Sequence, residues 1–135
     1  MREIKFRGKL KEHFGNKDGS VVIQKGTWIK GGVVFDEDRV WIDTKYHGQI
    51  LVDKETVGQY TGLHDKNGKE IYEGDIVKID CPTMKLTGKI KYSEMSAMFY
   101  IHDEIEDIEE TLWYQKEEYE VIGNIYENPE LLKED

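Results

Sequence analysis

The sequence predicts a mainly β protein made of antiparallel strands, with an SH3-like small barrel in its second half. Apolar and polar residues alternate in several short runs, which is the period of a half-buried strand. These runs are rich in β-branched and aromatic residues, and clusters of Gly, Asn and Asp separate them as turns. The length of 135 residues suits one domain. We expect an N-terminal β subdomain (1–57) and a barrel-like subdomain with an acidic segment (58–135), together forming one compact unit.

The first expected strand lies in "EIKFRGK", residues 3–9. Ile4 and Phe6 would face the core, whereas Arg7 and the other charged residues of the run would face solvent. Residues 11–20, "KEHFGNKDGS", have the composition of a loop.

Three further expected strands follow in the first half. The β-branched and aromatic run "VVIQKGTWI" (21–29) favours a half-buried strand. Residues 33–35 and 40–42 read as two short strands of a hairpin, joined by a four-residue loop at 36–39. The run 50–52 is either a strand or the lead-in to one.

The strongest turn signal lies at residues 65–68, "DKNG". Asn67 and Gly68 favour the positive φ angles of a type I′ turn. Gly74 and Asp75 then favour a tight bend at the start of a strand, because Gly accepts unusual torsion angles and Asp can accept hydrogen bonds from nearby backbone N–H groups.

Two runs after this turn, 73–80 and 88–92, predict an antiparallel pair joined by a loop around Pro82. Ile76 would lie on the opposite face from the inward residues. The residues expected to face inward are Val77, Ile79, Ile90 and Tyr92. The spacing "GD-x-V … G-x-I" resembles the strand pair of SH3-like small barrels.

The last third contains two more expected strands and one expected helix. "AMFYI" (97–101) and "EVIGNIY" (120–126) read as strands, and a turn at Asn128-Pro129 precedes a short helical turn. A short amphipathic helix is expected near residues 103–112. Its apolar stripe would consist of Ile101, Ile105, Ile108 and Leu112, at spacings of four, three and four.

Charge divides the chain into two unequal parts. Residues 1–60 carry 11 Lys and Arg against 9 Asp and Glu, a net of +2, and residues 61–135 carry 8 against 19, a net of −11. The first 17 residues alone have a net of +4. The overall net of −9 argues against a broad nucleic-acid-binding face, although a local contact through the basic start remains open. An acidic second half would suit a basic partner.

No motif for catalysis, a metal or a cofactor stands out. "DKNG" lacks the spacing of an EF-hand, and Cys81 and the four His residues have no paired zinc-ligand spacing. The serines lack a G-x-S-x-G context, and no Gly-rich phosphate loop follows a strand. We therefore expect no enzyme and no cofactor.

The expected compartment is the cytoplasm of a bacterial host. One cysteine cannot form an internal disulfide, which fits a reducing environment. The start "MREIKFRGKL" has no apolar segment of a signal peptide, and no run of 18 apolar residues occurs, so no membrane partner is expected.

Five residues are the candidates for an interaction site. Trp28 and Trp41 could stack nucleobases on a β face, or they could fill a core or an oligomer interface. Tyr60, His64 and Tyr72 are the residues of their stretch that no turn or strand rule requires.

Three segments resemble the YopX family, small proteins found mainly in bacteriophages and prophages. They are "MREIKFRG" at the start, "ETVGQYTGLHDKNGKEIYEGDIVKI" in the centre and "EVIGNIYENPELL" near the end. His64 stands where the family often has lysine. The resemblance implies a mostly β protein encoded by a phage or prophage, with no assigned activity and no catalytic residues to carry over.

Three functional hypotheses follow. The first is a non-enzymatic interaction protein that self-associates and binds a basic host or phage protein. The second is a single-stranded nucleic-acid-binding module that uses the basic N-terminal segment and exposed aromatic residues. The third, a hydrolase assembled from scattered carboxylates and histidines, would require a polar pocket with perturbed titratable groups.

Overall fold

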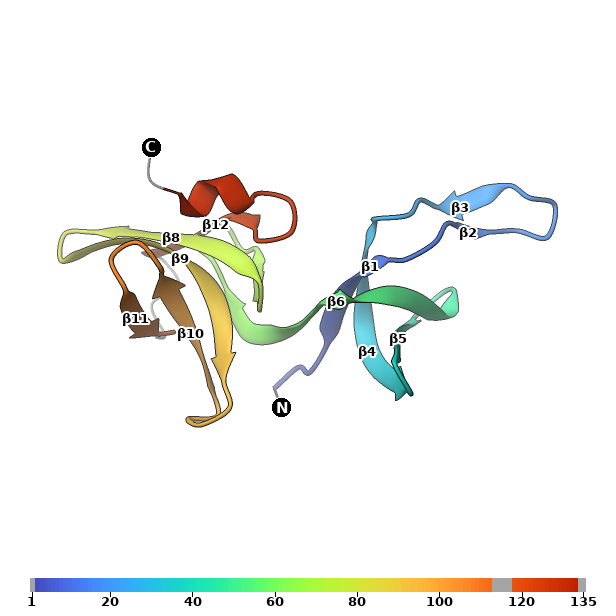
Figure 1. The fold of residues 1–135 in the computed structure, drawn as a ribbon, viewed down its shortest axis with the longest axis horizontal. Coiled ribbons are helices and arrows are strands. Elements are labelled where there is room, and N and C mark those ends of the chain that lie inside the picture. The colour runs from blue at the N-terminus through green and yellow to red at the C-terminus, as the bar shows by residue number, and fades with distance from the viewer. Residues whose placement is uncertain (1, 113–117, 134–135) are drawn as a thin grey trace. The chain divides into compact units, whose positions relative to one another are not determined.

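The computed structural model describes residues 2–112 and 118–133 and consists almost entirely of antiparallel strands (Figure 1). The predicted mainly β fold is therefore confirmed. The chain divides into two compact units, residues 1–59 and 60–135. The expectation that the subdomains 1–57 and 58–135 form one compact unit stays a prediction. Within the described residues, we find no helix with the length and apolar character needed to cross a membrane.

The first unit contains a ring of four strands and a separate hairpin. The strands of the unit are β1 (Phe6–Leu10), β2 (Phe14–Gly15), β3 (Val21–Ile23), β4 (Trp28–Asp36), β5 (Arg39–Thr44) and the first part of β6 (Gly48–His64). The ring consists of β1, β4, β5 and β6. β1 pairs with β4 and β6, and β5 also pairs with both, so the ring closes. β2 and β3 form a separate hairpin. The core consists of Leu10, Ile29, Val40, Ile42, Ile50 and Val52.

The ring closes through a bulge in β6. Lys9 pairs with Asp53, but Arg7 already pairs with Gly58, so extra residues of β6 lie between the two pairs. The buried hydroxyl of Thr56 accepts the N–H of Lys9 at 2.8 Å and donates to the carbonyl of Asp53 at 2.6 Å. The bulge therefore keeps its backbone groups satisfied while the strand bends.

The expected faces of the first strand were wrong for two residues. Ile4 precedes β1 and is exposed, whereas Arg7 is only 6% exposed. The guanidinium carbon of Arg7 lies 4.4 Å from the centroid of the Trp28 ring. Burial costs less free energy for a cation that lies on an indole face than for a charge surrounded by aliphatic groups. This difference explains why Arg7 is buried.

Turns also differ from expectation in the first half. The run 21–29 is broken between β3 and β4, and the loop 11–20 contains β2. Asp36 and Arg39 pair across the β4–β5 hairpin, so its loop has two residues instead of four. Glu37 adopts a positive φ of 55°, as such short hairpin loops require.

The second unit contains a five-stranded antiparallel sheet with the order β11-β10-β9-β8-β12. The elements of the whole unit are the end of β6, β7 (Glu70–Tyr72), β8 (Asp75–Cys81), β9 (Met84–Ser93), β10 (Met98–Asp103), β11 (Ile108–Thr111), β12 (Tyr119–Asn124) and a 3₁₀ helix, η2 (Pro129–Leu132). The helix η2 contacts β9. The core consists of Ile71, Val77, Ile79, Leu86, Ile90, Ile101 and Tyr119. The expected SH3-like barrel closure is not confirmed by this order of strands.

The predicted antiparallel pair is β8 and β9, joined by a two-residue loop that contains Pro82. Val77 and Ile79 are buried as expected. Ile76 is buried as well, so β8 is covered on both faces at its start, and Tyr92 is exposed beside the ring of Phe99. Strict alternation fails where a strand is covered on both sides or leaves the core.

The short helix expected near residues 103–112 was wrong: β10 and β11 form a hairpin there, with Asp103 paired with Ile108. The carboxylate of Asp103 accepts the N–H groups of Ile105 and Glu106 at 2.9 and 3.1 Å. Aspartate that binds local N–H groups in this way favours a turn over a helix. Ile105 and Ile108 are consequently exposed, and only Ile101 is buried.

The turn at residues 65–68 is present, but it is not of type I′. Gly68 has a φ of 80°, whereas Asn67 does not have the positive φ that a type I′ turn requires. The carboxylate of Asp65 determines this geometry by accepting the N–H groups of Asn67 and Lys69, both at 2.9 Å. Its other oxygen accepts the N–H of Val121 at 2.9 Å and so binds the turn to β12.

Asp65 is only 3% exposed, yet the pKa of its carboxyl group is lowered rather than raised. Burial raises the pKa of its carboxyl group, but the N–H groups of Val121, Lys69 and Asn67 together lower it by more, so the pKa lies below its ordinary value. Because the folded pKa lies below the unfolded one, this stabilisation is present above the unfolded pKa. It is lost as the pH falls through the folded pKa.

We therefore predict that Asp65→Ala lowers the free energy of unfolding by about 3 kcal/mol at neutral pH, because three N–H donors lose a charged acceptor. The difference between the unaltered chain and the variant should shrink between about pH 5 and pH 3. Urea denaturation at each pH measures it. Asp80→Asn, which alters an exposed carboxylate of the same unit, should change stability by less than about 0.5 kcal/mol. A difference that stays constant down to pH 3 would contradict the role of the Asp65 charge.

Candidate functional site

Tyr60, His64 and Tyr72 lie together in the second unit. Tyr60 and Tyr72 are paired residues of β6 and β7, and their ring centroids are 5.4 Å apart. The hydroxyl of Tyr60 lies 3.2 Å from Nδ1 of His64, within hydrogen-bond distance. The structure thus brings together three residues that the sequence singled out without linking them.

This cluster is mostly buried. Tyr60 is 4% exposed and Tyr72 is 1% exposed, and His64 is half-buried. The carboxylate of Asp75 accepts the N–H of Tyr72 at 2.7 Å, and the hydroxyl of Tyr72 donates to Glu70 at 3.1 Å. With these partners the two tyrosines support the fold, and His64 is the member of the cluster that a ligand could reach. The proposed role of the three in interaction stays a prediction.

Trp28 lies in the first unit, directly opposite Lys9 in the pairing of β1 with β4. Its ring lies against two cations: the guanidinium of Arg7 at 4.4 Å and the ammonium of Lys9 at 5.4 Å. A half-buried indole between basic side chains can attract a negatively charged ligand and offer it a stacking surface.

Trp41 lies on the same unit, in the middle of a row of apolar side chains. It pairs with Val34 of β4 on one side and with Leu51 of β6 on the other. The guanidinium of Arg39 lies 5.7 Å from its ring centroid. Each of the two candidate tryptophans therefore has at least one cation against its ring, which sequence spacing alone did not show.

The β10–β11 hairpin forms an acidic edge where the sequence pattern predicts a helix. Its carboxylates come from Glu104, Glu106, Asp107, Glu109 and Glu110. An ion pair and hydrogen bond with Lys89 lower the pKa of Glu104, so this carboxyl already has a basic partner. The remaining carboxylates and the exposed side chains of Ile105 and Ile108 form a surface that is both acidic and apolar.

A hollow of about 420 Å³ lies beside this edge. β11 contributes Glu109, Glu110 and Thr111 to its lining. The β9–β10 turn and β10 contribute Met95, which is 98% exposed, and the exposed Met98. Exposed methionines adapt to different apolar partners because their side chains are flexible and polarizable.

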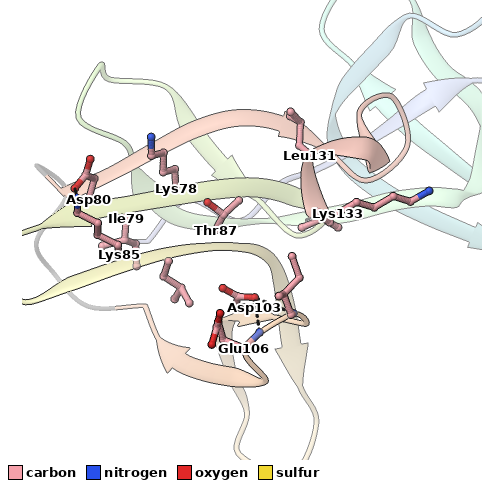
Figure 2. Close-up of a pocket in the computed structure, with 12 residues that line it drawn as sticks. Lys78, Ile79, Asp80, Lys85, Thr87, Asp103, Glu106, Leu131 and Lys133 are labelled. Atoms are coloured by element: carbon pink, nitrogen blue, oxygen red, sulfur yellow. Dashed lines mark hydrogen bonds and ion pairs between the residues drawn. The ribbon is translucent and has the colours of Figure 1, made fainter. Parts of the chain in front are cut away.

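A second groove of about 450 Å³ lies between the strands and the C-terminal residues of this unit, as Figure 2 shows. Its charged residues are Lys78, Lys85 and Lys133 together with Asp80, Asp103 and Glu106. Positive and negative groups are equal in number, and the Asp103 carboxylate is already bonded to the turn N–H groups. The groove therefore offers no clear preference for the charge of a ligand.

Within residues 2–112 and 118–133, no group of three or more His, Cys, Asp or Glu side chains is arranged to hold a metal ion.

The family model described as "YopX protein" matches residues 17–133. The chain is similar to the crystal structure of protein EF1440 from Enterococcus faecalis, with 25% sequence identity, coverage of 98% of this chain and 100% of that chain, and a TM-score of 0.46. No curated protein matched. Because the family match spans nearly the whole chain, the protein belongs to the YopX family.

Proposed function

We propose that the chain is a non-enzymatic interaction protein, encoded by a phage or prophage, that binds a basic host or phage protein in the bacterial cytoplasm. The observation that carries this proposal is the acidic β10–β11 hairpin at one end of the sheet in the second unit. It combines exposed carboxylates with exposed isoleucines, as a surface needs for attraction and for contact.

Electrostatics support a basic partner over an acidic one. The second half has a net charge of −11, which steers basic proteins toward it and repels nucleic acid and acidic proteins. Glu109 and Glu110 lie on the outermost strand of the sheet, where a partner can reach them without displacing another strand. Lys89 pairs with Glu104 at the start of the turn, and Nε2 of His102 lies 3.3 Å from the carboxylate of Asp107.

The test is capture from a lysate of the bacterial host, followed by titration of the purified chain with the captured protein. We predict a basic protein whose binding weakens as the salt concentration rises. The double change Glu109→Lys and Glu110→Lys should weaken binding by about tenfold or more.

A matched control carries the same change of net charge at the other edge of the sheet: Glu127→Lys and Glu130→Lys, beyond β12. This control should keep its affinity within about twofold apart from the general effect of net charge. The absence of any saturable partner, or an equal loss in both double variants, would refute the proposal.

Self-association is part of the same proposal. Phe35, which is 70% exposed, lies near the end of β4. On the opposite face of the same strand, the exposed Val34 pairs with Trp41, and Trp41 pairs with Leu51. Exposed apolar side chains of this kind are typical of contacts between subunits. We expect sedimentation velocity to give a mass above that of one chain, and Phe35→Lys to reduce it. A monomeric unaltered chain at about 100 µM would contradict self-association.

A second candidate function is single-stranded nucleic-acid binding by the first unit. The observation that favours it is the placement of cations against both tryptophans: Arg7 and Lys9 at Trp28, and Arg39 at Trp41. Bases stack on indole rings, and the neighbouring cations would contact phosphates. The first 60 residues have a net charge of only +2, which favours weak binding.

Fluorescence anisotropy with labelled single-stranded oligonucleotides tests this candidate. We expect salt-sensitive binding, and we expect Trp41→Ala to raise the dissociation constant by about fivefold or more, since one stacked base contributes about 1–3 kcal/mol. Tyr92→Ala removes an exposed aromatic side chain from β9 of the acidic second unit and serves as the control. Absence of binding at about 50 mM salt would exclude this function.

A further inference from the structure

We propose that the outer edge of β11, with the hollow beside it, takes an extended lysine- or arginine-rich segment of a protein partner as an added strand of the sheet. This inference rests on the proposed function, in which the acidic hairpin binds a basic protein. It names the structural element that the partner supplies and the backbone groups that receive it.

The two edges of the sheet differ in their backbone partners. At the β12 edge, the N–H of Val121 donates to the carboxylate of Asp65, and the carbonyl of Tyr119 accepts the N–H of Lys66, both at 2.9 Å. Lys66 and Glu120 add an ion pair at 3.1 Å. The turn at residues 65–68 thus occupies the positions that an added strand would need.

The β11 edge has no such cover among residues 2–112 and 118–133. β11 pairs with β10 from Tyr100↔Thr111 to Asp103↔Ile108, and no other described strand pairs with it. In a strand, the backbone groups of successive residues point alternately to the two sides, so half of those in β11 face outward. An exposed edge of this kind is a template for strand addition.

The hollow beside β11 gives a place for the side chains of an added strand. Met95 and Met98 provide apolar contact on one side, and Glu109 and Thr111 line the β11 side. Successive residues of a strand point to opposite faces, so a segment that alternates basic and apolar residues would place its basic residues on the Glu109 face of β11 and its apolar residues on the face of the exposed Ile108. The surface therefore fits a basic β-strand better than a compact ligand.

Charge also selects against two other occupants. Pairing with β11 of a second copy would bring the Glu109 and Glu110 carboxylates of both chains together, and like charges across adjacent strands are destabilising. A nucleic acid would place phosphates against the same carboxylates. A segment rich in Lys or Arg is the occupant that removes both conflicts.

The experiment uses the full chain and a labelled peptide that alternates Lys and Val over eight residues. Two further peptides carry N-methyl groups on every second residue, one starting at the first residue and one at the second. We expect the unmodified peptide to bind and to protect β11 amides from hydrogen exchange. One of the methylated peptides should bind at least about tenfold more weakly, because its methyl groups block the N–H groups that face β11.

The variants of the acidic edge separate this inference from the proposed function. Glu109→Lys with Glu110→Lys should lower the affinity for the unmodified peptide by about tenfold. Glu127→Lys with Glu130→Lys should lower it by less than about twofold. Strand addition is overturned if both methylated peptides bind as well as the parent, or if the unmodified peptide fails to bind. In either case the proposed function still stands if the captured basic protein depends on Glu109 and Glu110, and it fails if that protein does not.

Discussion

The buried carboxylate of Asp65 is the interaction on which the second unit depends. One side chain accepts the N–H groups of Asn67 and Lys69 in its own turn and that of Val121, which lies 56 residues further along the chain. It therefore shapes the turn before β7 and holds that turn against the edge of the sheet. Its charge stays in place because these N–H groups outweigh the effect of burial on its pKa.

The hydrogen bond from the N–H of Val121 to Asp65 makes the two edges of the sheet different. The β12 edge is closed by the Asp65 turn, whereas β11, at the other end, pairs with β10 alone among the described strands. Natural proteins commonly protect open edges with charged residues, and β11 carries Glu109 and Glu110. Those charges discourage pairing between identical edges and at the same time favour a basic strand. The closed edge thus contributes stability, and the open edge is where we propose that a basic partner binds.

Local patterns predicted much of the fold but less of the candidate site. Alternation located β8 and β9 and the burial of Val77 and Ile79. The isoleucines from 101 to 108 fit a helix equally well, because short apolar runs carry too few residues to separate the two periods. The hairpin is favoured by the hydrogen bonds that the Asp103 carboxylate accepts from the N–H groups of Ile105 and Glu106. The contact of Tyr60 with Tyr72 depends on strand pairing with a register shift, which no local rule contains.

One edge of the sheet is closed by Asp65, and at the other edge β11 pairs with β10 alone among the described strands. Hydrogen exchange of individual amides in the full chain at neutral pH tests this difference most directly. We expect slow exchange for the N–H of Val121, which donates to Asp65. We expect fast exchange for alternate amides of β11, because no described strand pairs with its outer edge. Uniform protection of all β11 amides at the level of Val121, in the absence of any partner, would contradict this difference.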